Sequence, residues 1–241
     1  MSSEILVYLI TFLAALLTLF TGFCLGTILT PTLAFFYDIK IAVFLTAIVH
    51  GFNSLLKVYI YRKQISLQVL KRFGVISIVG AFIGAYLQLY LYSSWLKMLL
   101  GVLLLILGAQ EFLPKHKALT FTRKIDFAGG FFSGLLGGLI GNQGAIRSAY
   151  LLNYDLSKEV FIATASSIAL LIDLTRVPVY LVSYRQQLSG NWLVLFGLVI
   201  VAYLGTIAGS KLVKKVPTGI FKKIVALAVV VLGVLLVLRV I

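Results

Sequence analysis

The chain has 241 residues, of which 61% are hydrophobic and only 12% are charged, and its mean hydropathy is +1.09. This composition leaves too little polar surface to coat a soluble globule, so it predicts an integral membrane protein and excludes a soluble globular domain. A formal net charge of +14 is compatible with nucleic-acid binding, but the 21 Lys and Arg residues mostly separate hydrophobic runs. We therefore expect these cations to contact anionic membrane lipids, with no nucleic acid as a partner.

Apolar runs between charged or turn-forming breaks predict an all-α polytopic fold with about eight transmembrane segments. The runs lie at 5–36, 40–61, 68–92, 95–112, 125–152, 157–184, 190–211 and 219–240. The first and fifth runs are longer than one straight helix needs, and both contain glycines. Each is expected to be a tilted, glycine-broken helix or a re-entrant hairpin. The first run lacks the features of a cleaved signal peptide, so it is expected to remain in the membrane.

A hydrophilic stretch divides the chain into a first transmembrane repeat at 1–113, a polar linker at 114–124 and a second transmembrane repeat at 125–241. The two halves carry an ordered series of similar residues, which predicts an internal duplication. The pairs are Gly80 and Gly84 with Gly205 and Gly209, Tyr61-Arg62 with Tyr184-Arg185, Lys40 with Lys158, Thr46 with Thr164, and Thr21-Gly22 with Ser133-Gly134. Four crossings per half would make the repeats parallel, whereas re-entrant first segments would make them inverted. The Gly-xxx-Gly pairs are expected to mark close helix packing.

A glycine-rich break within the fifth run ends on a cation, Arg147. An unpaired cation at membrane depth costs about 3 kcal/mol or more, so Arg147 needs a partner. Where glycines unwind a helix, backbone N–H groups such as that of Gly144 become free to bind an anion. The side chains of Gln143 and Asn142 would add neutral donors. The alternatives are that Arg147 reaches a membrane interface and that Asn142 and Gln143 cap a helix.

Asp173 and Arg176 lie three residues apart in the sixth run, so they share a helix face and are expected to form an ion pair. Asp173 is the single carboxylate expected deep within a span. If transport is coupled to protons, Asp173 is the expected coupling residue, and its protonation would release Arg176 for substrate.

A polar stripe runs along the second span. His50, Asn53 and Lys57 recur at helical spacing and are expected to face the protein interior or a water-filled cavity, where they can bind substrate. His50 serves equally well as a hydrogen-bonded core residue, and Lys57 lies near enough to the span end to reach the interface. Thr46 and Thr164, which match in the proposed repeat, either bind the anion or bond to carbonyls of their own helices.

These features resemble the TauE/SafE sulfite exporter (TSUP) family of membrane permeases. The resemblance covers nearly the whole chain and rests on glycine-rich first segments at 21–26 and 133–144, a helix opening at 157–165, and a Gly-xxx-Gly helix before a terminal apolar helix in each half. It implies export of a small organosulfur anion, such as sulfite, sulfoacetate or a related sulfonate, by a multi-pass protein of the bacterial inner membrane. The first half departs from the family pattern at Gly26–Thr30, where the family tends to repeat glycine.

Enzyme motifs are weak or absent. The sequence contains no zinc-protease, P-loop or nucleophile-elbow motif, and two histidines and one cysteine do not make a conventional metal site, so we expect no metal, no cofactor and no catalytic residue. Three other readings remain open: a passive small-anion channel, a non-transporting scaffold, and an intramembrane hydrolase built around Ser133. A small anionic substrate and membrane lipids are the expected partners, and a homodimer is left open.

Overall fold

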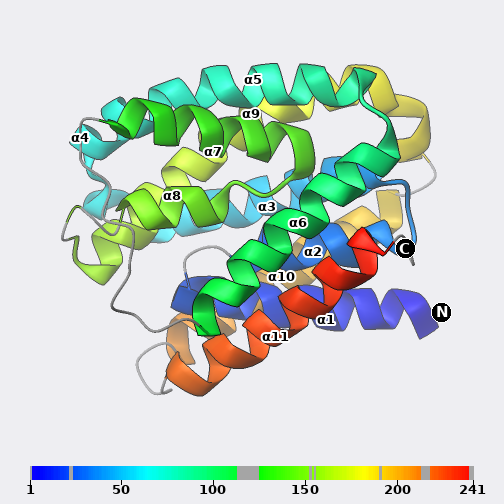
Figure 1. The fold of residues 1–241 in the computed structure, drawn as a ribbon. Coiled ribbons are helices and arrows are strands. Elements are labelled where there is room, and N and C mark those ends of the chain that lie inside the picture. Colours follow the sequence, from blue (N-terminus) through cyan, green and yellow to red (C-terminus); the bar gives the residue numbers. More distant parts are fainter. Residues whose placement is uncertain are drawn as a thin grey trace.

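The computed structural model describes residues 2–21, 24–112, 125–151, 154, 156–189, 192–212 and 218–238, and this part of the chain consists of helices and short connections, with no strand (Figure 1). The helices are α1 (Ser2–Thr21), α2 (Cys24–Ala34), α3 (Ile39–Ile60), α4 (Leu67–Val69), α5 (Val75–Tyr90), α6 (Ser93–Phe112), α7 (Asp126–Ile140), α8 (Gly144–Leu151), α9 (Lys158–Ser189), α10 (Trp192–Leu212) and α11 (Thr218–Val237). A 3₁₀ turn, η1 (Arg62–Gln64), and a π-helical turn, η2 (Leu70–Gly74), connect α3 to α5. The all-α prediction is confirmed.

Four helical stretches are long and apolar enough to cross a membrane: Ile39–Ile60, Leu67–Tyr90, Lys158–Gln187 and Trp192–Lys211. Shorter apolar helices cover Ile5–Thr18, Leu25–Ala34, Ser93–Ala109 and Asp126–Ile140. Several long apolar helices in one chain make it a multi-pass membrane protein. The count of eight crossings stays a prediction, and the polar linker at 114–124 lies outside the described residues.

The first and fifth apolar runs are each divided into two helices. The first run forms α1 and α2, and the fifth forms α7 and α8 with a non-helical break at Gly141–Gln143. Figure 1 shows α8 folding back beside α7, so the fifth run is a hairpin rather than one tilted helix. The sixth run extends further than the predicted 157–184. Its helix continues to Ser189 across a kink at Tyr184, where φ and ψ are −122° and 22°.

Glycines allow two helix pairs to approach closely. A Cβ added at Gly80 or Gly84 of α5 would collide with the backbone of α7, and one added at Gly134 would collide with the carbonyl oxygen of Ser77 on α5. The α10–α1 pair repeats this arrangement, since a Cβ at Gly209 would lie 2.6 Å from the Leu16 carbonyl oxygen. The prediction that the Gly-xxx-Gly pairs serve helix packing is therefore confirmed.

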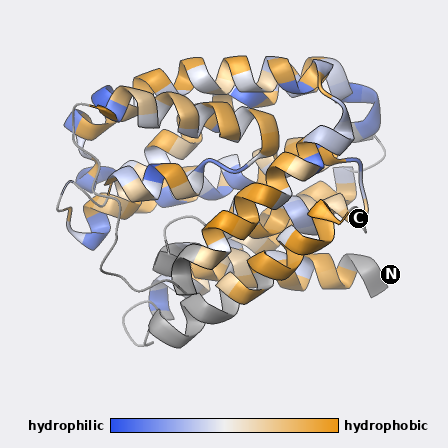
Figure 2. Ribbon diagram, in the orientation of Figure 1, coloured by the Kyte–Doolittle hydropathy of each residue, from blue (hydrophilic) through white to orange (hydrophobic). Residues whose placement is uncertain are grey.

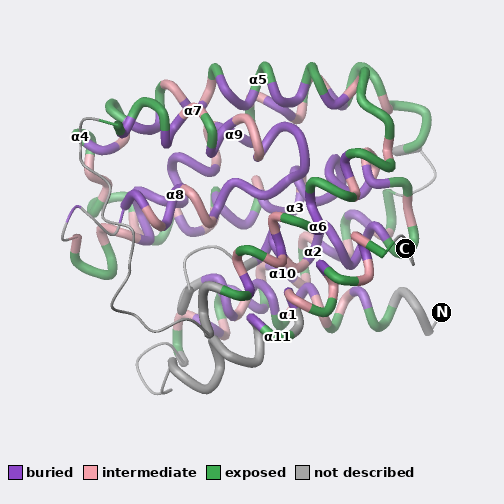
Figure 3. Tube along the Cα trace, viewed as in Figure 1, coloured by how far each residue is buried: buried purple, intermediate pink, exposed green. Residues whose placement is uncertain are grey.

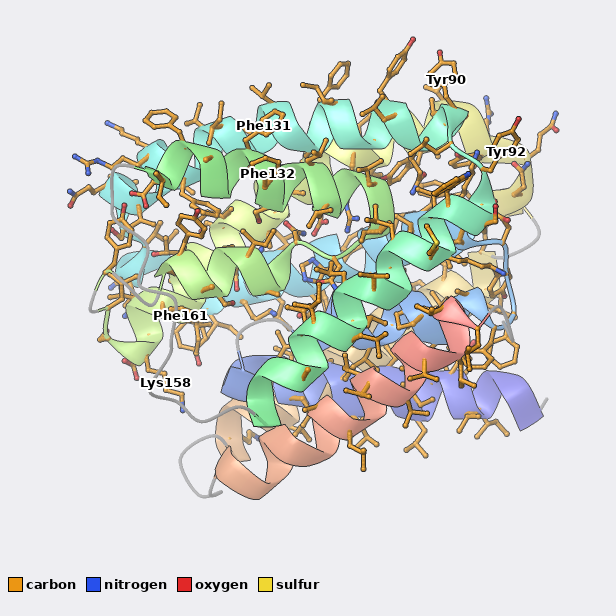
Figure 4. All side chains as sticks on the ribbon, viewed as in Figure 1. Tyr90, Tyr92, Phe131, Phe132, Lys158 and Phe161 are labelled. Carbon is orange, nitrogen blue, oxygen red and sulfur yellow. The ribbon has the colours of Figure 1, made fainter. Side chains whose placement is uncertain are left out.

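The surface of the bundle has the distribution that a lipid environment requires. Large apolar side chains are exposed along α5, α6 and α10, and hydrophilic residues gather toward the two ends of the bundle (Figure 2). Tyr90 and Tyr92 project at one end, whereas Lys158 lies at the opposite end (Figure 4). Amphipathic aromatic rings favour the membrane–water interface, so this distribution is the one expected of helices that cross a bilayer.

The most deeply buried part of the fold lies around α3, α8 and α9, where Figure 3 shows long stretches of buried chain. Helix α3 packs against α9, α2 packs against α3, α8 contacts α9, and α2 and α8 contact each other. Apolar side chains surround this centre, but α3 and α9 also place buried polar and charged side chains within it. These polar groups require partners, because lipid and apolar side chains supply none.

Candidate functional site

The α7–α8 break begins at Gly141, which ends α7 with a left-handed backbone at φ 75°. Glycine adopts this conformation without the steric cost of a Cβ, and its N–H donates to the Gly137 carbonyl oxygen at 3.1 Å. Because α8 starts at Gly144, the N–H groups of its first turn face the break and add the partial positive charge of a helix N-terminus.

Side chains from neighbouring helices bond to the last carbonyl oxygens of α7. Arg176 Nη1 donates to the Gly137 oxygen at 2.5 Å, the Tyr180 hydroxyl donates to the Gly138 oxygen, and Gln88 Nε2 donates to the Leu139 oxygen at 3.0 Å. A helix end buried in a membrane protein needs such donors, and a cation at a helix C-terminus is also electrostatically favourable. Arg176 therefore has a structural task at the end of α7.

Asp173 is the centre of a buried hydrogen-bond network. Its Oδ2 lies 2.7 Å from His50 Nδ1, and its Oδ1 accepts from Arg176 Nε at 2.9 Å, with Arg176 Nη2 at 2.7 Å. Both residues of the expected ion pair are fully buried, at 1% and 0% exposure. The structure thus joins His50 of α3 to the Asp173–Arg176 pair of α9, a contact that sequence spacing does not reveal.

Gln143 links this carboxylate to Arg147. Its Nε2 donates to Asp173 Oδ1 at 3.2 Å, and its Oε1 accepts from Arg147 Nη1 at 3.4 Å. The Ser133 hydroxyl holds the backbone by donating to the Gln143 carbonyl oxygen at 2.9 Å. The side chain of Gln143 is therefore a bridge between charged groups, which differs from the alternative that it caps a helix.

Arg147 is a buried cation whose charge is balanced by few hydrogen bonds and by no nearby carboxylate among the described residues. It is 2% exposed, so it does not reach an interface. Among the described residues no carboxylate lies within ion-pair distance of Arg147, its contact with Gln143 is long, and its Nε has no hydrogen-bond partner. Asp173 acts on Arg147 only at longer electrostatic range. A guanidinium in this state, beside the start of α8, is suited to bind an anion.

Asn142 points toward the first half of the chain. Its Oδ1 accepts from the Thr27 hydroxyl of α2 at 3.2 Å, whereas its Nδ2 has no partner. A Cβ at Gly26 of α2 would lie 2.9 Å from the Gly141 carbonyl oxygen and 3.9 Å from His50 Cδ2. Helix α2 therefore closes over the break, and residues from both halves meet there.

The other predicted site residues occupy different places. Asn53 ties α3 to α10, since its Nδ2 donates to the Ala202 oxygen at 3.2 Å and to the Thr206 hydroxyl at 2.5 Å. Thr164 accepts from the Ser66 N–H at 2.9 Å, beside the start of α4, and this contact lies outside the Asp173 network. Lys57 is buried within electrostatic range of His50. Thr46 is buried without a hydrogen-bond partner for its hydroxyl.

Sequence reasoning did not identify Thr27 and Thr30 of α2, Gln88 of α5 or Tyr180 of α9. The two threonines lie one helical turn apart in the glycine-containing sequence that begins at Gly22, which is the available sequence signal for them. Gln88 and Tyr180 have no such signal, because their task depends on where α7 ends. Among the described residues, no group of three or more His, Cys, Asp or Glu side chains is arranged to hold a metal ion.

Comparison with known proteins gives one match. A family model described as "Sulfite exporter TauE/SafE" matches residues 7–236, nearly the whole chain. No curated protein and no solved structure matches. The members of this family are membrane transporters of sulfite and sulfonate type, which agrees with the apolar helices and with the resemblance seen in the sequence. The chain belongs to the sulfite exporter TauE/SafE family.

Proposed function

We propose that this protein is a secondary transporter that exports a small organosulfur anion, such as sulfite, sulfoacetate or a related sulfonate, across the bacterial inner membrane. The anion binds near the membrane midplane to Arg147, the first-turn N–H groups of α8 and the side chains of Asn142 and Gln143. The observation that carries this proposal is the burial of Arg147 at the α7–α8 break without a carboxylate partner among the described residues. An anionic ligand would supply the missing charge.

The two halves are proposed to be inverted repeats. In this relation α1 corresponds to α7, α2 to α8, α3 to α9, α5 to α10 and α6 to α11. The observed packing supports it, because α1 packs against α10 as α7 packs against α5, while α3 packs against α9 and α6 against α11. A Cβ at Gly101 would lie 3.0 Å from the Gly233 carbonyl oxygen, and one at Gly233 would lie 2.9 Å from the Gly101 oxygen.

The directions of the helices favour inversion over a parallel repeat. In Figure 1, α1 begins at the right, beside the N label, whereas α7 runs toward the right into its hairpin; α6 and α11 also run in opposite directions. The 15 residues of α7 span about 22 Å, less than a hydrocarbon core of about 30 Å, as expected of a re-entrant segment. In this arrangement the end of α1 at Thr21 corresponds to the end of α7 at Ile140. The sequence pattern alone instead pairs Thr21 with Ser133.

The contact of His50 with Asp173 supports proton coupling. A proton on this pair weakens the hold of the carboxylate on Arg176 and Gln143, and Gln143 in turn contacts Arg147. Proton binding at Asp173 and anion binding at Arg147 are therefore energetically coupled in the proposed cycle. Arg176 remains at the end of α7 throughout, because it also bonds the Gly137 carbonyl oxygen.

A passive anion channel is the main rival function. A channel requires a continuous pore lined by its binding groups, whereas the polar groups of this centre are buried under other side chains. Occlusion favours a carrier that exposes its site to alternate sides of the membrane.

The test is thermal stabilisation of the detergent-purified protein by sulfite, sulfoacetate, taurine, thiosulfate, sulfate, lactate and chloride in turn. A ligand that binds only the folded protein must raise its Tm. We expect an organosulfur anion to do so in the wild type and not in Arg147→Ala. A stabilisation of equal size in both proteins would refute the assignment of Arg147.

A further inference from the structure

We propose that the hydroxyls of Thr30 and Thr46 and the amide of Asn142 form an uncharged subsite that donates hydrogen bonds to oxygen atoms of the transported anion. The subsite lies beside Arg147 and is contributed largely by the first half of the chain. This inference rests on the proposed function, and it adds the residues that recognise the anion without adding charge.

Thr30 and Thr46, like Ser54 and Ser148, do not bond to a carbonyl oxygen of their own helix, as many helical hydroxyl residues do. Those that do bond to the carbonyl oxygen four residues earlier include Thr11, Thr18, Thr32, Ser77, Ser167 and Thr175. The hydroxyls of Thr30 and Thr46 have no hydrogen-bond partner, although both residues are completely buried at 0% exposure. A buried hydroxyl that does not bond to the carbonyl oxygen four residues earlier is destabilising, unless a ligand or a water molecule accepts or donates a hydrogen bond there.

Thr30 lies against the glycine break, and Thr46 lies one helical turn from a residue of α3 that does so. Thr30 Oγ1 lies 2.8 Å from the position that a Cβ on Gly141 would occupy, and Val43 Cγ1 lies 3.5 Å from the same point. Thr46 follows Val43 by three residues and precedes His50 by four, so these three side chains share one face of α3. The unbonded hydroxyl of Thr30 on α2 therefore lies at the start of the break, and helical spacing places Thr46 on the face of α3 that reaches it.

Asn142 joins this pair to the charged part of the site. Thr27 donates to its Oδ1, and its Nδ2 is a buried donor without a partner. The next residue, Gln143, bonds to Arg147 and Asp173. Asn142 is therefore one residue from the side chain that contacts the guanidinium, so its amide donor and Arg147 belong to the same break.

The donors come from α2, α3 and the break, so they approach an anion from different directions. Several oxygen atoms on one sulfur centre, as in sulfite or a sulfonate, accept such bonds at separate points, whereas chloride offers a single centre. Uncharged donors also replace part of the hydration shell of the anion without burying further positive charge. The subsite therefore selects oxyanions over halides.

The test compares Thr30→Val with Thr32→Val, two nearly isosteric changes in the same buried helix. Binding of sulfite and of sulfoacetate is measured by titration of the detergent-purified protein, together with the Tm without ligand. We expect Thr30→Val to weaken oxyanion binding by about tenfold or more, since a hydrogen bond to a charged group is lost. Its ligand-free Tm should be equal to or higher than that of wild type, because an unbonded buried hydroxyl is removed.

Thr32→Val should bind both anions as wild type does and should lose stability, since Thr32 bonds to the Ile28 carbonyl oxygen at 2.7 Å. If Thr30→Val fails to fold, Thr46→Val is measured against Thr18→Val, whose hydroxyl bonds to the Ala14 oxygen at 2.9 Å. Wild-type affinity with a lowered ligand-free Tm in Thr30→Val would overturn the subsite and leave the proposed function standing. Failure of sulfite and sulfoacetate to bind the wild type would contradict both.

Discussion

Replacing Arg176 and Arg147 one at a time by methionine separates a structural cation from a ligand-binding one. Arg176 bonds to Asp173 at 2.7 and 2.9 Å and to the Gly137 oxygen at 2.5 Å. Removing one partner of a buried ion pair costs about 3–5 kcal/mol, because the other charge is left buried. A chain of this size loses about 2–4 °C in Tm per kcal/mol, so we expect Arg176→Met to lower the Tm by roughly 6–20 °C.

Arg147→Met should have the opposite effect on the ligand-free protein. The substitution leaves no carboxylate without its ion-pair partner, since no described acidic group lies within ion-pair distance of Arg147. It removes a buried charge and keeps a side chain of similar length, so we expect an unchanged or higher Tm. Burial of both arginines is similar, at 0% and 2% exposure, and burial alone cannot explain opposite outcomes.

The assay is thermal unfolding in detergent without added anion, on both single variants and on Asp173→Asn/Arg176→Met. The double variant removes both charges, so it should recover much of the stability that Arg176→Met loses. A Tm for Arg176→Met equal to that of wild type would refute the structural role of Arg176. A loss of stability in Arg147→Met as large as in Arg176→Met would refute the claim that Arg147 has no ion-pair partner in the ligand-free protein.

Three further outcomes are expected. Gly134→Val should prevent close packing of α5 and α7 and so reduce the yield of folded protein. The control Ala128→Val, on the exposed face of α7, should not reduce it. Equal yields of the two variants in gel filtration would contradict this prediction. Tyr180→Phe should cost about 1–3 kcal/mol in thermal unfolding, because the Gly138 carbonyl loses its donor. Tyr184→Phe should cost little, since the Tyr184 hydroxyl has no partner, and a larger loss there than in Tyr180→Phe would count against the reasoning. Gln143→Leu should bind sulfite with less dependence on pH than wild type does, and an unchanged pH profile would show that Gln143 does not link Asp173 to Arg147.

Features that depend on residues close together in the sequence were predictable from it. The glycine break before Arg147, the ion pair of Asp173 with Arg176 and the packing of the Gly-xxx-Gly helices all follow from spacing along one helix. The contact of His50 with Asp173 joins α3 to α9, and no spacing within either helix reveals it. The bond from Arg176 to Gly137 likewise depends on where α7 ends in space.

The kink at Tyr184 and the π-helical turn at Leu70–Gly74 were also beyond prediction. Hydrophobic periodicity reports which residues face inward, but it does not detect a local change in helical winding. The threonines of α2 were missed for another reason. A threonine hydroxyl normally bonds within its own helix, so only the three-dimensional structure distinguishes Thr30 from Thr32.

The most direct test of the account is anion counterflow in proteoliposomes that contain wild type, Arg147→Met or Arg147→Lys. Vesicles are loaded with unlabelled sulfite or sulfoacetate, and entry of the labelled anion is followed. A carrier with its site at Arg147 predicts transient accumulation that saturates with concentration in wild type, its loss in Arg147→Met, and at most partial activity in Arg147→Lys, because lysine lacks the bidentate geometry of arginine. Unchanged counterflow in Arg147→Met, or non-saturating flux in wild type, would contradict the account.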